Sequence, residues 1–209
     1  WTGHSTTGSP LTPGPGVFYI LARTAAQGSR AGLLSVASVA VGNFLNAIAA
    51  SLGLATLLTL FPTTVNGLRQ IGAIYLIYLG FRALRPVLAS EGTRLDTIGK
   101  WAIFREGLLV ALLNPKTALF FGAFLPQFVD PAWSMSAQCI ALGAVFVGIA
   151  LLSDSLYVFT AGAFLLSTER WRRQRSFVHH LGGLLLISLG IFGALSGLAE
   201  QNALPVRIP

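Results

Sequence analysis

Long apolar stretches recur along the chain and are separated by short segments that contain glycine, proline and charged residues. Within the stretches, Leu, Ala, Val, Ile, Phe and Gly follow one another without the periodicity of a half-buried helix or the alternation of a strand. A helix needs about 20 apolar residues to cross the hydrocarbon core of a bilayer. The pattern predicts six helices, over residues 11–26, 32–61, 66–84, 105–129, 137–167 and 177–198.

The connections between the predicted helices are rich in residues that interrupt helices. Glycine adopts backbone conformations that other residues avoid, and proline cannot donate a backbone hydrogen bond, so clusters of the two mark turns. Such clusters occur in the segments 27–32, 61–67, 85–94 and 130–134. The expected fold class is therefore an all-α integral membrane protein with six transmembrane helices.

The composition agrees with a chain that lies in a bilayer. Of the 209 residues, 54% are hydrophobic and 10% are charged. The mean hydropathy of +0.71 is higher than soluble domains of this length usually show. Apolar segments occupy the whole length, so we expect one transmembrane domain over residues 1–209. The single cysteine, Cys139, excludes an internal disulfide and a multi-cysteine metal site.

Membrane topology explains the formal net charge of +7. Basic residues gather in the first, third and fifth connections, and this bias marks cytoplasmic loops. We therefore expect these connections to face the cytoplasm and both termini to lie on the other side. The same explanation covers the basic segment 169–180, so membrane lipids are expected as surroundings and nucleic acid is not expected as a partner.

The first predicted helix is shorter than the others. Residues 11–26 would form roughly 24 Å of helix, which is less than the thickness of a bilayer core. They follow the polar segment WTGHSTTGSP, which has neither the basic nor the apolar region of a signal peptide. We expect the first helix to be incomplete in this sequence.

Two short motifs place proline beside a polar residue inside apolar helices. They are LTPGP at residues 11–15 and LLNPK at residues 112–116, and each opens a set of three predicted helices. Because three is odd, the second set crosses the membrane in the opposite sense, as in the inverted repeats of secondary transporters. The expected organisation is a first repeat over 11–85, a cytoplasmic loop over 86–104 and a second repeat over 105–198. Two unrelated proline kinks would produce the same motifs.

The prolines of both motifs must interrupt their helices. Proline removes a backbone donor and displaces the carbonyl group one turn earlier, and hydrocarbon cannot satisfy the polar groups that this frees. Each break is therefore expected to face protein or water. Gly14 has no side chain, so a ligand or a neighbouring helix can approach the backbone closely there.

Polar residues of four helices fall at similar predicted depths. Gly14, Asn43, Lys116 and Asp154 lie about 16 to 21 Å from the cytoplasmic ends of their spans, near the middle of the bilayer. A charge at that depth is costly and marks a functional site. We expect Lys116 to meet an anion, either the carboxylate of a substrate or Asp154, the one carboxylate that we count inside the spans. A purely structural pair is the alternative.

Asn43 and Asn46 share a face of the second helix. Their amides can bind a ligand or join helices by hydrogen bonds, and the sequence leaves both roles open. The predicted substrate-binding residues are Pro13, Gly14, Pro15, Asn43, Asn46, Asn114, Pro115 and Lys116, and the predicted coupling residue is Asp154. No catalytic or metal-binding residue is predicted, because the sequence has no HExxH, no G-x-S-x-G and no Cys or His cluster.

The motifs together resemble the lysine exporter and homoserine/threonine efflux (LysE/RhtB) family of small amino-acid exporters of the bacterial inner membrane. The resemblance covers residues 11–200 and is carried by LTPGPGVFYILARTAAQGSRAGL, VGNFLNAIAASLGLA, IGAIYLIYLGFRALR, FREGLLVALLNPKTALFFGAFLPQFV and SDSLYVFTAG. It implies a six-helix exporter driven by the proton gradient, with a site between the repeats. It also implies that residues 13–15 and 114–116 match the two signature motifs of the family.

The predicted function is therefore a secondary-active, proton-coupled exporter of small amino acids or their derivatives, a multi-pass protein of the bacterial inner membrane. Its expected partners are the amino acid and protons; no cofactor and no enzymatic activity are expected, and homo-oligomerisation stays open. Asn43 stands where relatives in the resembled family have Asp, which leaves Asp154 as the better proton carrier. The alternatives are a cation or metal exporter, which would need several inward carboxylates, and a membrane scaffold without transport activity.

Overall fold

The computed structural model describes residues 14–53, 62–84, 99–166 and 175–203. Over these ranges the chain forms α-helices and one 3₁₀ helix, without strands. The helices are α1 (Pro15–Gln27), α2 (Ser29–Ser51), α4 (Pro62–Leu84), α5 (Lys100–Leu112), α6 (Pro115–Phe124), α7 (Met135–Leu166) and α9 (Arg175–Ala203), and the 3₁₀ helix η1 is Leu125–Phe128. The prediction of an all-helical chain is confirmed.

Within the described ranges, two helices are long and apolar enough to cross a membrane: α2 over its whole length and α7 over Met135–Ala163. A third span results if α5 is joined to the α6–η1 segment, from which it is bent by 54°. Large apolar side chains are exposed along α4, α7 and α9, among them Ile74, Phe159 and Phe192. Such a surface suits lipid better than water.

Several helix boundaries differ from the predicted ones. The helix α4 begins at Pro62, so most of the predicted turn 61–67 is helical, because proline at the first position of a helix needs no N–H partner. The helix α5 begins at Lys100 after Gly99, inside the predicted loop 86–104. The predicted turn at 85–94 lies mostly outside the described residues.

The predicted turn at 27–32 is reduced to Gly28. This residue has a φ of 87°, which glycine adopts without steric cost. Its N–H donates to the Thr24 carbonyl at 2.8 Å and so caps α1. The chain reverses there and enters α2 at Ser29. The predicted turn at 130–134 is confirmed, with the Ala132 N–H donating to Asp130 Oδ1 at 2.9 Å.

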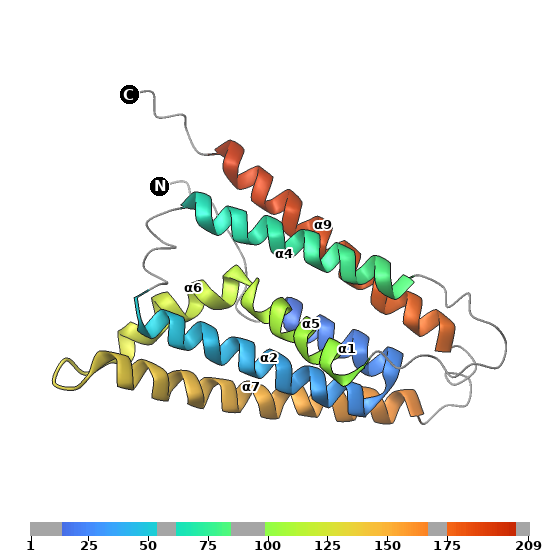
Figure 1. Cartoon of the computed structure of the whole chain (residues 1–209), viewed down its shortest axis with the longest axis horizontal. Helices are drawn as coiled ribbons and strands as arrows, with labels where there is room; N and C mark the ends of the chain where they lie inside the picture. Colours follow the sequence, from blue (N-terminus) through green and yellow to red (C-terminus); the bar gives the residue numbers. More distant parts are fainter. Residues whose placement is uncertain (1–13, 54–61, 85–98, 167–174, 204–209) are drawn as a thin grey trace, which may run out of the picture.

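The bundle consists of two side-by-side helix pairs with shorter helices between them (Figure 1). One pair is α4 with α9, and the other is α2 with α7. The helices α1, α5 and α6 lie between these pairs in the view of Figure 1. Side chains from most of the described helices therefore form the core. Its buried members are Tyr19, Ile20, Val36, Val39, Leu76, Leu79, Val110, Ala111, Val158 and Leu186.

Small residues allow both pairs to pack closely. A Cβ atom placed on Gly80 of α4 would lie 2.7 Å from the Gly183 carbonyl oxygen of α9, and Gln70 donates to the Ala194 carbonyl at 3.1 Å. The two helices are therefore antiparallel, and α2 and α7 are antiparallel as well. In that pair, Gly143 meets Ala47 and Gly162 meets Ser29.

Candidate functional site

The break predicted at Pro115 separates α5 from α6. Asn114 caps α6, because its Oδ1 accepts from the backbone N–H of Lys116 at 3.1 Å and its amide nitrogen donates to Thr117 Oγ1 at 2.8 Å. Pro115 follows as the first helical residue, where its missing N–H costs nothing. The asparagine and the proline thus end one helix and start the next.

A second helix begins in the same manner at α1. Gly14 precedes it in an extended conformation, and Pro15 is its first residue. A Cβ atom built on Gly14 would lie 3.8 Å from the amide nitrogen of Asn114. The first residues of two proline-initiated helices therefore meet inside the bundle. Pro13 lies outside the described residues.

The meeting of these two ends concentrates positive electrostatic potential. The first turns of an α-helix expose N–H groups without intrahelical partners, and the aligned peptide dipoles add to the effect. A carboxylate is the kind of group that such an end binds. Because Gly14 carries no side chain, the backbone of α1 can approach Asn114 closely.

Two other helices contact the break between α5 and α6, through Asn46 of α2 and Gly72 of α4. The buried amide of Asn46 on α2 donates to the Ala111 carbonyl at 3.0 Å. This carbonyl also accepts from the Asn114 N–H at 3.2 Å, and it lacks the usual helical donor because Pro115, four residues later, has no N–H. On α4, a Cβ atom placed on Gly72 would lie 2.7 Å from the Leu113 carbonyl oxygen. Of the two roles left open for Asn46, the structure assigns it an interhelical hydrogen bond.

Asn43 differs from Asn46, although both lie on α2. Its side chain is half-buried, next to Gly42, whose Cα packs against Ala111 and Leu108 of α5. Within the described part of the chain, Asn43 makes no side-chain hydrogen bond. The Asn43 amide therefore lies within one turn of Asn46 and has no hydrogen-bond partner among the described residues.

The predicted ion pair between Lys116 and Asp154 is not formed. Lys116 is the second residue of α6 and its side chain is exposed, and Asp154 forms no ion pair with any described residue. The contacts of α7 with α2 place Asp154 level with Val36, about 10 Å along α2 from Asn43. The prediction of one common depth was wrong for Asp154, because the sequence does not reveal how far α7 is shifted along α2.

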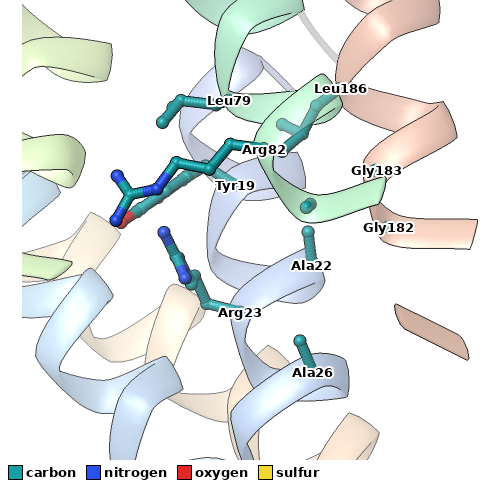
Figure 2. A pocket seen from close by; sticks show the side chains of 10 residues that line it. Tyr19, Ala22, Arg23, Ala26, Leu79, Arg82, Gly182, Gly183 and Leu186 are labelled. Atoms are coloured by element: carbon teal, nitrogen blue, oxygen red, sulfur yellow. The ribbon is translucent and has the colours of Figure 1, made fainter. Parts of the chain in front are cut away.

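A cleft lies at another level of the bundle, between α1, α4 and α9 (Figure 2). Its volume is about 50 Å³. Arg23 of α1 and Arg82 of α4 line it together with Tyr19, and small residues of α1 and α9 complete the wall. Figure 2 shows the two guanidinium groups close to each other, near the tip of the Tyr19 ring. Tyr19 is 1% exposed, and its hydroxyl donates to the Ile103 carbonyl at 3.0 Å.

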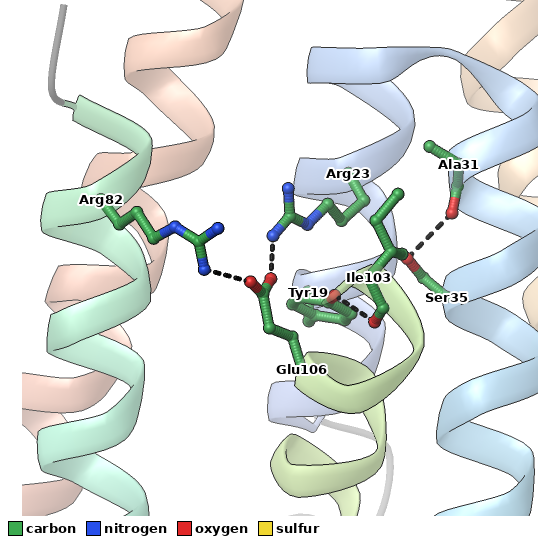
Figure 3. A network of polar contacts seen from close by, with 7 residues as sticks. All are labelled: Tyr19, Arg23, Ala31, Ser35, Arg82, Ile103 and Glu106. Atoms are coloured by element: carbon green, nitrogen blue, oxygen red, sulfur yellow. Dashed lines mark hydrogen bonds and ion pairs between the residues drawn. The ribbon is translucent and has the colours of Figure 1, made fainter. Parts of the chain in front are cut away.

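Glu106 of α5 joins these two arginines (Figure 3). One carboxylate oxygen pairs with Arg82 and the other with Arg23, and Glu106 is 2% exposed. Sequence reasoning missed this cluster, because it treated the arginines as markers of cytoplasmic loops and counted Asp154 as the only carboxylate in the spans. That count was wrong. The signal was present, since Arg23 and Glu106 both fall inside predicted spans.

A helix that is broken at a proline inside an apolar bundle, as between α5 and α6, is typical of a membrane transporter. A family model described as LysE type translocator matches residues 9–197. The chain therefore belongs to the LysE type translocator family, which confirms the resemblance, and it is a membrane transporter rather than an enzyme.

The relatives agree with this assignment. A leucine efflux protein of Salmonella typhimurium is 33% identical over 160 residues, which cover 74% of each chain. A leucine efflux protein of Klebsiella pneumoniae is 30% identical over 178 residues, or 84% of this chain and 82% of the relative. An uncharacterised membrane protein of Pseudomonas aeruginosa is 32% identical over 190 residues, or 87% of each chain. No solved structure matches the chain.

Proposed function

We propose that the protein exports small apolar amino acids, leucine among them, from the bacterial cytoplasm across the inner membrane in exchange for protons. Two of the relatives described above are named leucine efflux proteins, which supports the substrate class. The observation that carries the proposal is the contact between Gly14 and Asn114, where two helix ends meet.

The architecture proposed for this activity is six spans in two inverted repeats. Three pairings support it, each between a helix of the first repeat and its counterpart in the second: α1 with α5–α6, α2 with α7, and α4 with α9. The last two pairs are antiparallel, as an inverted repeat requires. For the first pair, Gly14 adjoins Asn114 and Tyr19 bonds to Ile103, which is also the antiparallel order.

The substrate carboxylate is proposed to bind between the first turns of α1 and α6. Pro15 and Pro115 are the first residues of α1 and α6, and the backbone N–H groups beside Gly14 and Asn114 supply donors. Pro13, which lies outside the described residues, is proposed as a further part of the site. Lys116 adds positive charge in the first turn of α6. The α2 side of the site is proposed to consist of Asn43 and Asn46. The Asn43 amide has no hydrogen-bond partner among the described residues, and the Asn46 amide binds the end of α5.

Asp154 is proposed as the residue that carries the coupling proton. It is half-buried on α7, and it has no ion-pair partner among the described residues. A carboxylate of this kind can take up and release a proton without the loss of a salt bridge. Asn43, by contrast, cannot ionise, so α2 contributes binding but no proton transfer.

The test compares Asn114→Asp with Asn114→Ser in reconstituted proteoliposomes that contain L-leucine. Aspartate and serine both cap helices well, so both variants should fold, and thermal unfolding in detergent checks this. Aspartate places a negative charge where the substrate carboxylate is proposed to bind. We expect it to lower leucine transport by about tenfold or more, since like charges in contact cost several kcal/mol.

The serine variant is the matched control, because it shortens the side chain without adding charge. We expect it to retain leucine transport within about threefold, given that it keeps a capping oxygen. Equal transport by the Asp and Ser variants would show that no carboxylate binds at this break.

A further inference from the structure

The cluster of Arg23, Arg82 and Glu106 carries more positive than negative charge. Two guanidinium groups share one carboxylate, and no other ion pair of these three residues occurs in the described part of the chain. The cluster therefore has a formal charge of one positive unit. An uncompensated charge that is partly removed from water is costly, and a bound anion would offset the cost.

The two arginines keep donors available for such an anion. The ion pairs with Glu106 use one terminal nitrogen of each guanidinium, whereas each guanidinium carries five N–H donors. The side chain of Arg23 is 13% exposed and that of Arg82 is 36% exposed, against 3% for Glu106. Both arginines line the cleft between α1, α4 and α9, and Glu106 is absent from its wall.

The cleft has room for the carboxylate of a ligand. Its volume of about 50 Å³ exceeds the roughly 10–15 Å³ that one water molecule needs on the same measure. Ala22, Gly182 and Gly183 form part of its wall and add little bulk to it. A ligand would insert its anionic group between Arg23 and Arg82.

We propose that this cleft is a second substrate site, which binds the carboxylate of the exported amino acid before it reaches the helix break. This inference rests on the proposed function. Arg23 lies on the same helix as Gly14 and about 14 Å away along its axis, so α1 borders both sites. The positive-inside bias predicts that the cleft is at the cytoplasmic end, where the substrate enters.

The ligand class follows from charge and geometry. Guanidinium groups bind carboxylates and phosphates through paired N–H donors, and a net charge of one positive unit matches a single carboxylate. The phosphate of an anionic lipid offers similar chemistry at the membrane surface, so the experiment must separate the two. Glu106 then acts as a positioning residue, because it holds both guanidinium groups in place without lining the cleft.

The test uses the full chain with Asn114→Asp, which disables the proposed site at the break, in nanodiscs of phosphatidylcholine. L-leucine binding is measured by scintillation proximity, with leucinamide, which lacks the carboxylate, as the comparison ligand. We expect this protein to bind leucine and not leucinamide. Addition of Arg82→Gln should weaken leucine binding by about tenfold, the effect of one charge-assisted contact. Addition of Arg82→Lys should restore part of the affinity.

Arg105→Gln is the matched control, because Arg105 is an exposed arginine on α5 next to Glu106 and does not line the cleft. We expect it to leave leucine binding unchanged. In a chain with Asn114 intact, Arg82→Gln should raise the KM for leucine uptake into everted vesicles with little change in Vmax. Arg105→Gln should change neither the KM nor the Vmax for leucine uptake.

Three outcomes would overturn the proposal: no leucine binding by the Asn114→Asp protein, equal binding of leucinamide, or equal effects of Arg82→Gln and Arg105→Gln. An effect of Arg82→Gln only in nanodiscs with phosphatidylglycerol would assign the cleft to a lipid phosphate and would also overturn it. Failure of the proposed function is a separate result, since the chain with Asn114 and Arg82 intact would then transport no leucine.

Discussion

The two polar regions of the bundle bind charge by different means. At the helix break, Gly14 and Asn114 are neutral, and the positive potential comes from backbone N–H groups at two helix ends. In the arginine cluster, Arg23 and Arg82 carry full charges and Glu106 balances one of them. Backbone dipoles cost little to leave without an anion, and Lys116 at the break is exposed, whereas formal charges that are removed from water require a partner.

The difference between the two regions suggests a division of labour. The break is the proposed place where a substrate binds and leaves, and moderate attraction from dipoles would suit it. The cluster joins three helices, and Arg82 is its only member on α4. Its ion pair with Glu106 therefore links the α4–α9 pair to α5 (Figure 3), whereas Arg23 and Glu106 lie on the two helices between the pairs.

The largest expected effect on stability comes from Glu106→Gln. This change leaves two buried or half-buried guanidinium groups close together without a counter-charge, and loss of one partner of a buried ion pair costs about 3–5 kcal/mol. The free energy of unfolding, measured by SDS titration in mixed micelles, should fall accordingly.

Asp154→Asn makes the same chemical change at a carboxylate without an ion pair. We expect the free energy of unfolding to change by about 0.5 kcal/mol or less, as for sites without specific partners. Similar losses of stability in both variants would contradict the distinction between a paired and an unpaired carboxylate.

A smaller loss of stability is expected from Gly72→Ala, which tests how α4 supports the break. The added Cβ would lie 2.7 Å from the Leu113 carbonyl oxygen, and overpacking of this kind costs about 1–3 kcal/mol. Thermal unfolding in detergent measures the loss. Leucine transport should also fall, because α4 would be displaced from the break.

Gly67→Ala is the control on the same helix. Nothing lies within 4 Å of a Cβ atom placed on Gly67, and alanine favours a helix over glycine by about 1 kcal/mol. This variant should be slightly more stable than the parent protein. If Gly72→Ala is stabilising as well, α4 does not pack against the break as described.

The smallest effect is expected from Asn46→Leu compared with Asn43→Leu. Loss of the hydrogen bond to the Ala111 carbonyl should cost about 1 kcal/mol, while Asn43 has no such bond to lose. In a transport assay, Asn43→Leu should lower leucine transport more than Asn46→Leu does, because the Asn43 amide is the one proposed to be available to the substrate. Equal stability of the two variants would remove the structural role assigned to Asn46.

The sequence was sufficient for the helical class and for the break between α5 and α6 at Pro115. Long apolar stretches favour helices in a membrane, since every backbone group must be satisfied internally. A proline in the interior of such a stretch ends or bends the helix that precedes it. The predicted ion pair between Lys116 and Asp154 was wrong, because it depended on how two helices pack against each other and not on the chemistry of one helix. Depth along a single helix follows from counting residues, but the shift between two helices depends on side-chain packing that the counting does not include.

The sequence by itself determined that this protein is a helical membrane protein in which Pro15 and Pro115 begin helices, because local chain chemistry decides where a helix can form. Only the tertiary structure decided that Gly14 lies against Asn114 and that Glu106 lies between Arg23 and Arg82. These contacts join residues more than twenty positions apart in the chain. They depend on which helices pack together and at what level, and glycines such as Gly72 and Gly80 set that level by close approach.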